Sequence, residues 1–149
     1  LVYTKAGKYV GEWGERGEAE GSFRYPATIS FSPDKRLVYV VDVLNTRVQA
    51  FNSDTGKFVR QIGSWGVLPG EMFRPKGVAV DKKGRGYVTD SYMDVIQVFD
   101  DQADFQYVLG NGSKKIQRFT SPASIFIDDN NRLYVVEVLE NRVGVYKLK

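Results

Sequence analysis

The fold follows from one stretch of the chain, Lys76-Gly-Val-Ala-Val-Asp-Lys-Lys-Gly-Arg-Gly-Tyr-Val-Thr-Asp-Ser-Tyr-Met-Asp-Val-Ile-Gln-Val-Phe99. It holds three runs of β-branched and aromatic residues, with turn-forming residues between them at 83–84 and 91–94. Val, Ile, Tyr, Phe and Thr favour strands, whereas Gly, Asp and Asn favour the turns that join strands. The pattern therefore predicts consecutive antiparallel strands.

The same pattern occurs three times. Tyr-Val-Val-Asp at 39–42 is followed 48 residues later by Tyr-Val-Thr-Asp at 87–90, and Tyr-Val-Val-Glu at 134–137 follows 47 residues after that. An aromatic residue comes nine positions after each acid and a proline precedes each repeat, in the sets Phe51, Phe99 and Tyr146 and Pro26, Pro75 and Pro122. Several positions that keep one spacing indicate an internal structural repeat.

A four-stranded repeat of this length is typical of one blade of a β-propeller. In the first complete repeat, the alternation of apolar runs and turns predicts strands at 28–32, 37–42, 47–51 and 57–62. The sequence therefore predicts an all-β protein.

Two stretches resemble the NHL repeat family, Phe73-Arg-Pro75-Lys-Gly-Val-Ala-Val-Asp81 and Asp42-Val-Leu-Asn45-Thr-Arg47-Val-Gln-Ala-Phe51. The chain departs from the family pattern of Asn and Arg at Met93 and Val95, and from its Asn at Glu140. The resemblance implies a β-propeller of NHL-type four-stranded blades, with about three blades in this chain and about six in the whole propeller.

The repeat register divides residues 1–149 into a half blade at 1–13, blades at 26–63 and 75–110, and an incomplete blade at 122–149. Blades stack face to face, so the two outermost faces of such an arc expose apolar side chains. We expect exposed side chains there from Tyr3, Val10, Ile125 and Tyr134. Further blades of a parent chain, or a partner, are expected to cover both faces.

The chain contains no His and no Cys. This excludes Ser-His-Asp and Cys-His nucleophile arrangements and Cys/His zinc sites within these residues. Acids at inner-strand ends could bind Ca²⁺, as in the lactonases that resemble paraoxonase and regucalcin. We instead predict structural roles for Asp42, Asp90 and Glu137, with Arg47 and Arg142 in the family's arginine position facing the first and third. No catalytic residue, metal or cofactor is predicted.

The Gly-rich connections between repeats differ in charge while the strands stay alike. The connection at 11–23 is acidic, that at 63–73 is nearly neutral, and that at 110–119 is basic. Because loops on a rigid scaffold commonly carry binding, we predict a partner-binding edge formed by these connections. Its candidate residues are Trp13, Trp65, Tyr92, Arg74, Lys76, Lys114, Lys115 and Arg118. For the two tryptophans, packing across a blade junction is the favoured hypothesis.

These observations favour a non-enzymatic interaction scaffold that presents a loop edge to a protein partner. One alternative is a propeller hydrolase or lyase, lactonase-like or amidating-lyase-like, whose metal site lies in blades outside this chain. Another is single-stranded RNA binding, which the glutamates at 12, 15, 18, 20 and 71 disfavour because they repel phosphate. No apolar run is long enough to span a membrane. The resemblance implies an extracytoplasmic bacterial protein, and a cytoplasmic one stays open.

Overall fold

A computed structural model describes residues 1–110 and 118–148 of the protein. In this part of the chain thirteen strands form four sheets, and the helical content is one short 3₁₀ turn, η1 (Val43–Asn45). The strands are β1 (Val2–Tyr3), β2 (Tyr9–Gly11), β3 (Pro26–Phe31), β4 (Leu37–Asp42), β5 (Arg47–Asn52), β6 (Phe58–Ile62), β7 (Pro75–Val80), β8 (Gly86–Asp90), β9 (Val95–Phe99), β10 (Phe105–Leu109), β11 (Pro122–Ile127), β12 (Arg132–Glu137) and β13 (Arg142–Lys147).

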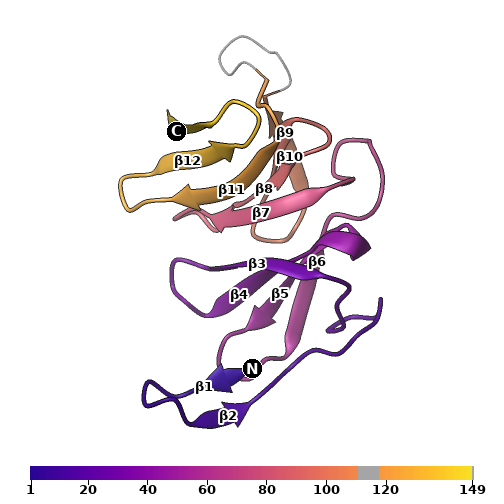
Figure 1. Cartoon of the computed structure of the whole chain (residues 1–149), viewed down its shortest axis with the longest axis vertical. Coiled ribbons are helices and arrows are strands. Elements are labelled where there is room, and N and C mark those ends of the chain that lie inside the picture. Colours follow the sequence, from indigo (N-terminus) through magenta and orange to yellow (C-terminus); the bar gives the residue numbers. More distant parts are fainter. Residues whose placement is uncertain (111–117, 149) are drawn as a thin grey trace.

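Each sheet is an antiparallel meander of strands that follow one another in the chain (Figure 1). The sheet β3–β6 and the sheet β7–β10 have four strands, the sheet β11–β13 has three, and β1 pairs only with β2. The first strands of the larger sheets, β3, β7 and β11, lie side by side. The prediction of an all-β protein built from propeller blades is confirmed. Within the described residues, no helix is long and apolar enough to cross a membrane.

The three larger sheets use the same register. The acid that ends the second strand lies opposite the first residue of the third strand, in the pairs Asp42↔Arg47, Asp90↔Val95 and Glu137↔Arg142. The first strand of each sheet begins at a proline and carries a register irregularity just after it. Residues spaced by the repeat therefore occupy equivalent positions.

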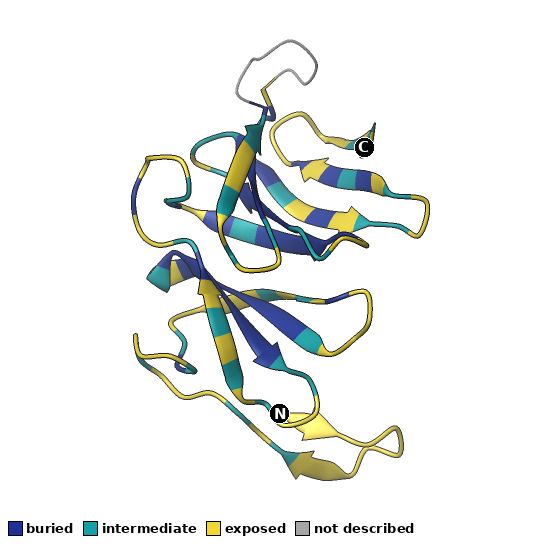
Figure 2. Ribbon diagram, turned by 180° about the vertical axis from the view of Figure 1, so that it is seen from behind, coloured by how far each residue is buried: buried dark blue, intermediate teal, exposed yellow. Residues whose placement is uncertain are grey.

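Apolar cores fill the two junctions between neighbouring blades (Figure 2). At the first junction, Val41 and Val48 of one sheet pack with Val78 and Val88 of the next. At the second junction, Tyr87 and Ile96 of the middle sheet pack with Leu133 and Val135 of the last sheet. A strand buried on both faces explains why β4 and β9 are nearly continuous apolar runs.

The prediction about the outer faces is partly wrong. Tyr3 and Val10 are exposed and Tyr134 is partly exposed, but Ile125 is buried because its side chain points into the second junction. The outer face of the last sheet instead consists of five side chains that neighbour one another along and across the strands. They are Phe126, Tyr134, Val136, Val143 and Val145. Their counterparts in the middle sheet are covered by the next blade.

Gly77 permits the close approach of β7 to β11. A Cβ atom at this position would lie 2.5 Å from the carbonyl oxygen of Ala123 and 3.0 Å from Cγ2 of Ile125. The hydroxyl of Thr89 also donates to the Ala123 carbonyl at 2.7 Å, so the backbone at this contact has little room to move.

We therefore expect Gly77→Ala to lower the free energy of unfolding by about 1–3 kcal/mol, because it overpacks the junction. Gly11→Ala is the matched control, since a Cβ atom there meets nothing within 4 Å. Urea denaturation of both variants measures the difference. Equal stability of the two variants would show that the sheets separate freely at this contact.

Candidate functional site

The edge of the blades where the connections arrive is called the rim here. It consists of the turns 43–46, 91–94 and 138–141 together with the connecting segments 14–25, 64–74 and 118–121. Antiparallel order places the start of the first strand, the end of the second and the turn to the third on the same edge of each sheet. Carboxylates buried at this edge bind both the turns and the connections.

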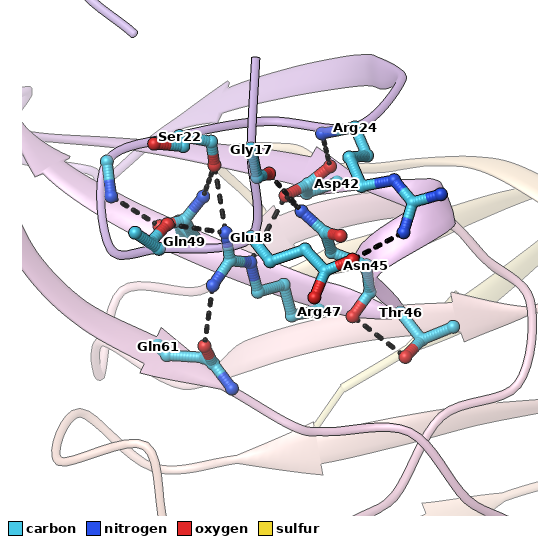
Figure 3. A network of polar contacts seen from close by, with 12 residues as sticks. Gly17, Glu18, Ser22, Arg24, Asp42, Asn45, Thr46, Arg47, Gln49 and Gln61 are labelled. Carbon is cyan, nitrogen blue, oxygen red and sulfur yellow. Dashed lines mark hydrogen bonds and ion pairs between the residues drawn. The ribbon is translucent and has the colours of Figure 1, made fainter. Parts of the chain in front are cut away.

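Asp42 is the centre of the first network (Figure 3). Its carboxylate accepts the backbone N–H of Arg24 at 2.7 Å, the amide of Asn45 at 2.7 Å and the Nε–H of Arg47 at 3.1 Å. Arg47 is also buried, and its guanidinium donates to the carbonyls of Ala19 and Ser22, both at 2.8 Å. Every charge in this cluster is therefore paired within the protein.

Asp90 binds its turn and its connection through four backbone donors in the described part of the chain. One carboxylate oxygen accepts N–H groups from Phe73 at 2.7 Å and Arg74 at 3.1 Å, and the other accepts them from Tyr92 at 3.0 Å and Met93 at 3.1 Å. A carboxylate that accepts several backbone hydrogen bonds needs no cation beside it. This explains how the middle blade accommodates Met93 and Val95 in place of Asn and Arg.

Glu137 closes the third network with a longer side chain. It accepts the N–H of Thr120 at 3.0 Å and the Nε–H of Arg142 at 2.9 Å. Hydrogen bonding to Glu137 raises the pKa of Arg142 above its ordinary value. The Arg142 side chain is about half exposed, unlike that of Arg47. Among the described residues, no three acids are grouped so that they could hold a metal ion.

Two buried glutamines that were not predicted from the sequence hold the connections. Gln49 accepts the N–H of Gly21 at 3.0 Å and donates to the carbonyl of Ser22 at 2.8 Å. Gln97 accepts the N–H of Gly70 at 2.8 Å and donates to the carbonyl of Glu71. The signal was present, since the two glutamines are separated by the 48-residue repeat spacing.

The connections 14–25 and 64–74 consequently have the same backbone. Arg16 bridges to Phe23 in the first, and Trp65 bridges to Met72 in the second. The N–H of Gly17 donates to the Phe23 carbonyl at 3.1 Å, and the N–H of Gly66 donates to the Met72 carbonyl at 3.0 Å. These shared contacts make position 16 structurally equivalent to 65, position 18 to 67 and position 19 to 68.

The side chains at these paired positions differ in kind. The first connection has Arg16, Glu18 and Ala19, whereas the second presents Trp65, Val67 and Leu68, which are 72%, 59% and 63% exposed. We call these last three residues the apolar tip. The junction-packing hypothesis is wrong for Trp65.

The junction-packing hypothesis fits Trp13. Its ring is half-buried and lies 4.7 Å from the ring of Phe51, centroid to centroid, in the apolar cluster on the first sheet. Trp13 therefore belongs to the packing of the fold, and Trp65 is the tryptophan on the accessible surface of the rim.

The remaining candidates lie at different depths. Tyr92 is exposed, its ring stacks on Phe73 at 4.2 Å between centroids, and the Arg74 guanidinium lies 6.0 Å from the Tyr92 centroid. Lys76 is partly buried on β7, where its carbonyl accepts the Thr28 hydroxyl. Arg118 is exposed. Lys114 and Lys115 lie outside the described residues.

Arg47→Ala should lower the free energy of unfolding by about 3–5 kcal/mol, because it leaves Asp42 buried without its cation and removes donors to two carbonyls. Arg142→Ala should lower it less, since the Arg142 side chain is about half exposed and water screens its ion pair. Chemical denaturation measures both, with the exposed Arg36→Ala as control. Equal losses for the two arginines would contradict this account of burial.

Comparison with known proteins supports the fold at the level of a family. Residues 9–136 match the family described as SMP-30/Gluconolactonase/LRE-like region. Peptidyl-glycine alpha-amidating monooxygenase A from Xenopus laevis is 28% identical over 96% of this chain, which spans 16% of that protein. Protein brain tumor from Drosophila melanogaster is 26% identical over 73% of this chain and 10% of its own length.

Among solved structures, virginiamycin B lyase from Staphylococcus aureus has the same fold with a TM-score of 0.64 at 16% identity. The alignment covers 97% of this chain and 47% of the lyase. The NHL assignment stays a prediction, because the matching family carries a different description. The chain belongs to the SMP-30/gluconolactonase/LRE-like β-propeller family.

Proposed function

We propose that this chain is a non-enzymatic binding scaffold whose rim holds a protein partner. The observation that supports the proposal is the contrast between the connections 14–25 and 64–74. They share one backbone arrangement, yet the first ends in charged side chains and the second in the apolar tip. Because the connection folds without apolar side chains, the exposure of Trp65, Val67 and Leu68 favours contact with another molecule.

The apolar tip is also held rigidly. Gln97 binds the connection at Gly70 and Glu71, and the Glu71 carboxylate accepts the N–H of Leu68 at 3.0 Å. Met72, which follows, is fully buried. A preorganised loop loses little conformational entropy on binding, and tryptophan is frequent at the centre of protein interfaces.

A propeller hydrolase or lyase is the second candidate, favoured by the similarity to amidating monooxygenase A along 96% of the chain. Within this chain, however, Asp42, Asp90 and Glu137 are already bonded to backbone amides, and the sequence has no His or Cys. Any catalytic histidine or cysteine would have to come from another part of a longer protein. We therefore propose the scaffold role for these residues.

Single-stranded RNA is a less favoured candidate for the ligand of the rim. The first connection carries Glu12, Glu15, Glu18 and Glu20, which oppose a phosphate backbone. Of these, Glu18 is neutralised by Arg24 at 2.6 Å. Membership of the NHL family and an extracytoplasmic location stay predictions.

The test exchanges the tip for the residues of the equivalent connection, as Trp65→Arg, Val67→Glu and Leu68→Ala combined. Random peptides displayed on phage are selected on the wild-type chain, and the selected peptides are then measured on both proteins. We expect at least about tenfold weaker binding to the variant, equivalent to about 1.4 kcal/mol, with an unchanged melting temperature.

Three results would contradict the scaffold proposal. The first is that the selected peptides bind the wild-type chain and the tip variant equally. The second is that the selection yields no binding peptide. The third is turnover of lactonase or amidating-lyase substrates by the chain itself.

A further inference from the structure

We propose that the rim takes an acidic segment of a protein partner, one that carries aliphatic or aromatic side chains and lies across the turns of successive blades. This inference rests on the proposed scaffold function and names the chemistry of its partner. Two observations carry it: an apolar side chain repeated at every turn of the rim, and an exposed arginine beside one of these side chains that has no ion pair with an acid among the described residues.

The repeated side chains are Leu44, Tyr92 and Leu139. Each stands two residues after the buried acid of its blade, and they are 61%, 59% and 71% exposed. None of them belongs to the hydrophobic clusters at the blade junctions. The turns need no large apolar residue to form, because the carboxylates and backbone hydrogen bonds already fix them. A row with one exposed apolar side chain per blade suits a partner that extends from blade to blade.

Arg74 supplies the charge. It is exposed, and it forms no ion pair with an acid in the described part of the chain. Two of the other rim arginines are paired, Arg24 with Glu18 at 2.6 Å and Arg142 with Glu137 at 2.9 Å, whereas the exposed Arg16 and Arg118, like Arg74, form no ion pair within the described residues. Glu71, the acid of its own connection, accepts the N–H of Leu68 and forms no ion pair with Arg74. Arg74 is therefore open to a carboxylate from outside.

The Arg74 side chain lies over an aromatic ring of the rim. Its guanidinium lies 6.0 Å from the centre of the Tyr92 ring, which in turn stacks on Phe73 at 4.2 Å. Asp90 holds the backbone of all three residues. A guanidinium fixed in this way can bind a carboxylate with two parallel hydrogen bonds. The flat face of Tyr92 and the apolar tip then offer contacts for the apolar side chains beside that carboxylate.

Charge along the rim indicates where the acids of the partner lie. The connection 14–25 has a net negative charge, which disfavours a carboxylate, whereas Arg74 and Lys76 stand at the start of the middle blade and the exposed Arg118 stands before the last blade. The acidic residues of the partner are therefore expected over the middle and last blades. Its apolar residues extend along the row toward Leu44 and Leu139.

The experiment measures fluorescence anisotropy with short synthetic peptides in which Asp or Glu alternates with Leu, Phe or Trp. A matched pool has Lys in place of the acids, and a uridine oligonucleotide represents single-stranded RNA. At low salt we expect the acidic pool to bind the wild-type chain at least about tenfold more tightly than the basic pool.

The variants separate charge from apolar contact. Arg74→Glu should weaken binding of the acidic pool about tenfold, Arg74→Lys should retain part of it, and Leu44→Ser with Leu139→Ser should weaken it by a similar factor. Lys57→Glu, on the opposite edge in the turn between β5 and β6, is the matched charge control and should have no effect. Melting temperatures of all variants verify that they are folded.

The outcomes distinguish this inference from the function on which it rests. Selected peptides that depend on the apolar tip, together with no preference for acidic peptides or no effect of Arg74→Glu, would overturn the inference and leave the scaffold function standing. Tighter binding of the oligonucleotide than of the acidic pool would assign the rim to nucleic acid and overturn the inference. Peptide binding that is unchanged when the apolar tip is exchanged would overturn both the inference and the scaffold function.

Discussion

Three buried carboxylates hold the connections of this propeller segment onto its blades. Asp42, Asp90 and Glu137 end equivalent strands, and each accepts the N–H of a residue that precedes the first strand of its sheet. A buried charge is tolerated only when its hydrogen-bonding capacity is used. The position of the rim therefore depends on these contacts more than on packing, since most rim side chains point toward solvent.

Each blade satisfies its carboxylate differently, and this variation shapes the rim. The first blade uses Arg47 and Asn45, whereas the middle blade uses four backbone N–H groups around Asp90. In both blades a buried glutamine, Gln49 or Gln97, also holds the connection. The connections 14–25 and 64–74 thus share one backbone arrangement, whereas the side chains at their tips differ.

Much of the fold could be predicted from the sequence. The spacing of Asp42, Asp90 and Glu137 placed the strands within a residue or two of those observed, because strand alternation and turn residues are local signals. The side of the sheet on which Ile125 lies could not be predicted in the same way. A register irregularity between Pro122 and Ile125 reverses the simple alternation along β11.

The candidate site was only partly predictable. The sequence identified Trp65, Arg74 and Tyr92 as rim residues, but it could not distinguish the exposed Trp65 from the packed Trp13, because both follow a Gly-rich pattern. The difference arises from three-dimensional packing on Phe51. The role of Gln97 escaped notice because a polar residue in a strand usually indicates an exposed face, and here it is buried to bind a loop.

Native-state hydrogen exchange tests the central claim most directly. If the carboxylates hold the rim, the amides of Arg24, Phe73 and Thr120 should exchange only with a free energy close to that of global unfolding, whereas the amides of Trp65 and Val67 should exchange far faster. The same fast exchange for all five amides would show that the rim opens independently of the blades. That result would contradict the account of the carboxylates as the contacts on which the rim depends.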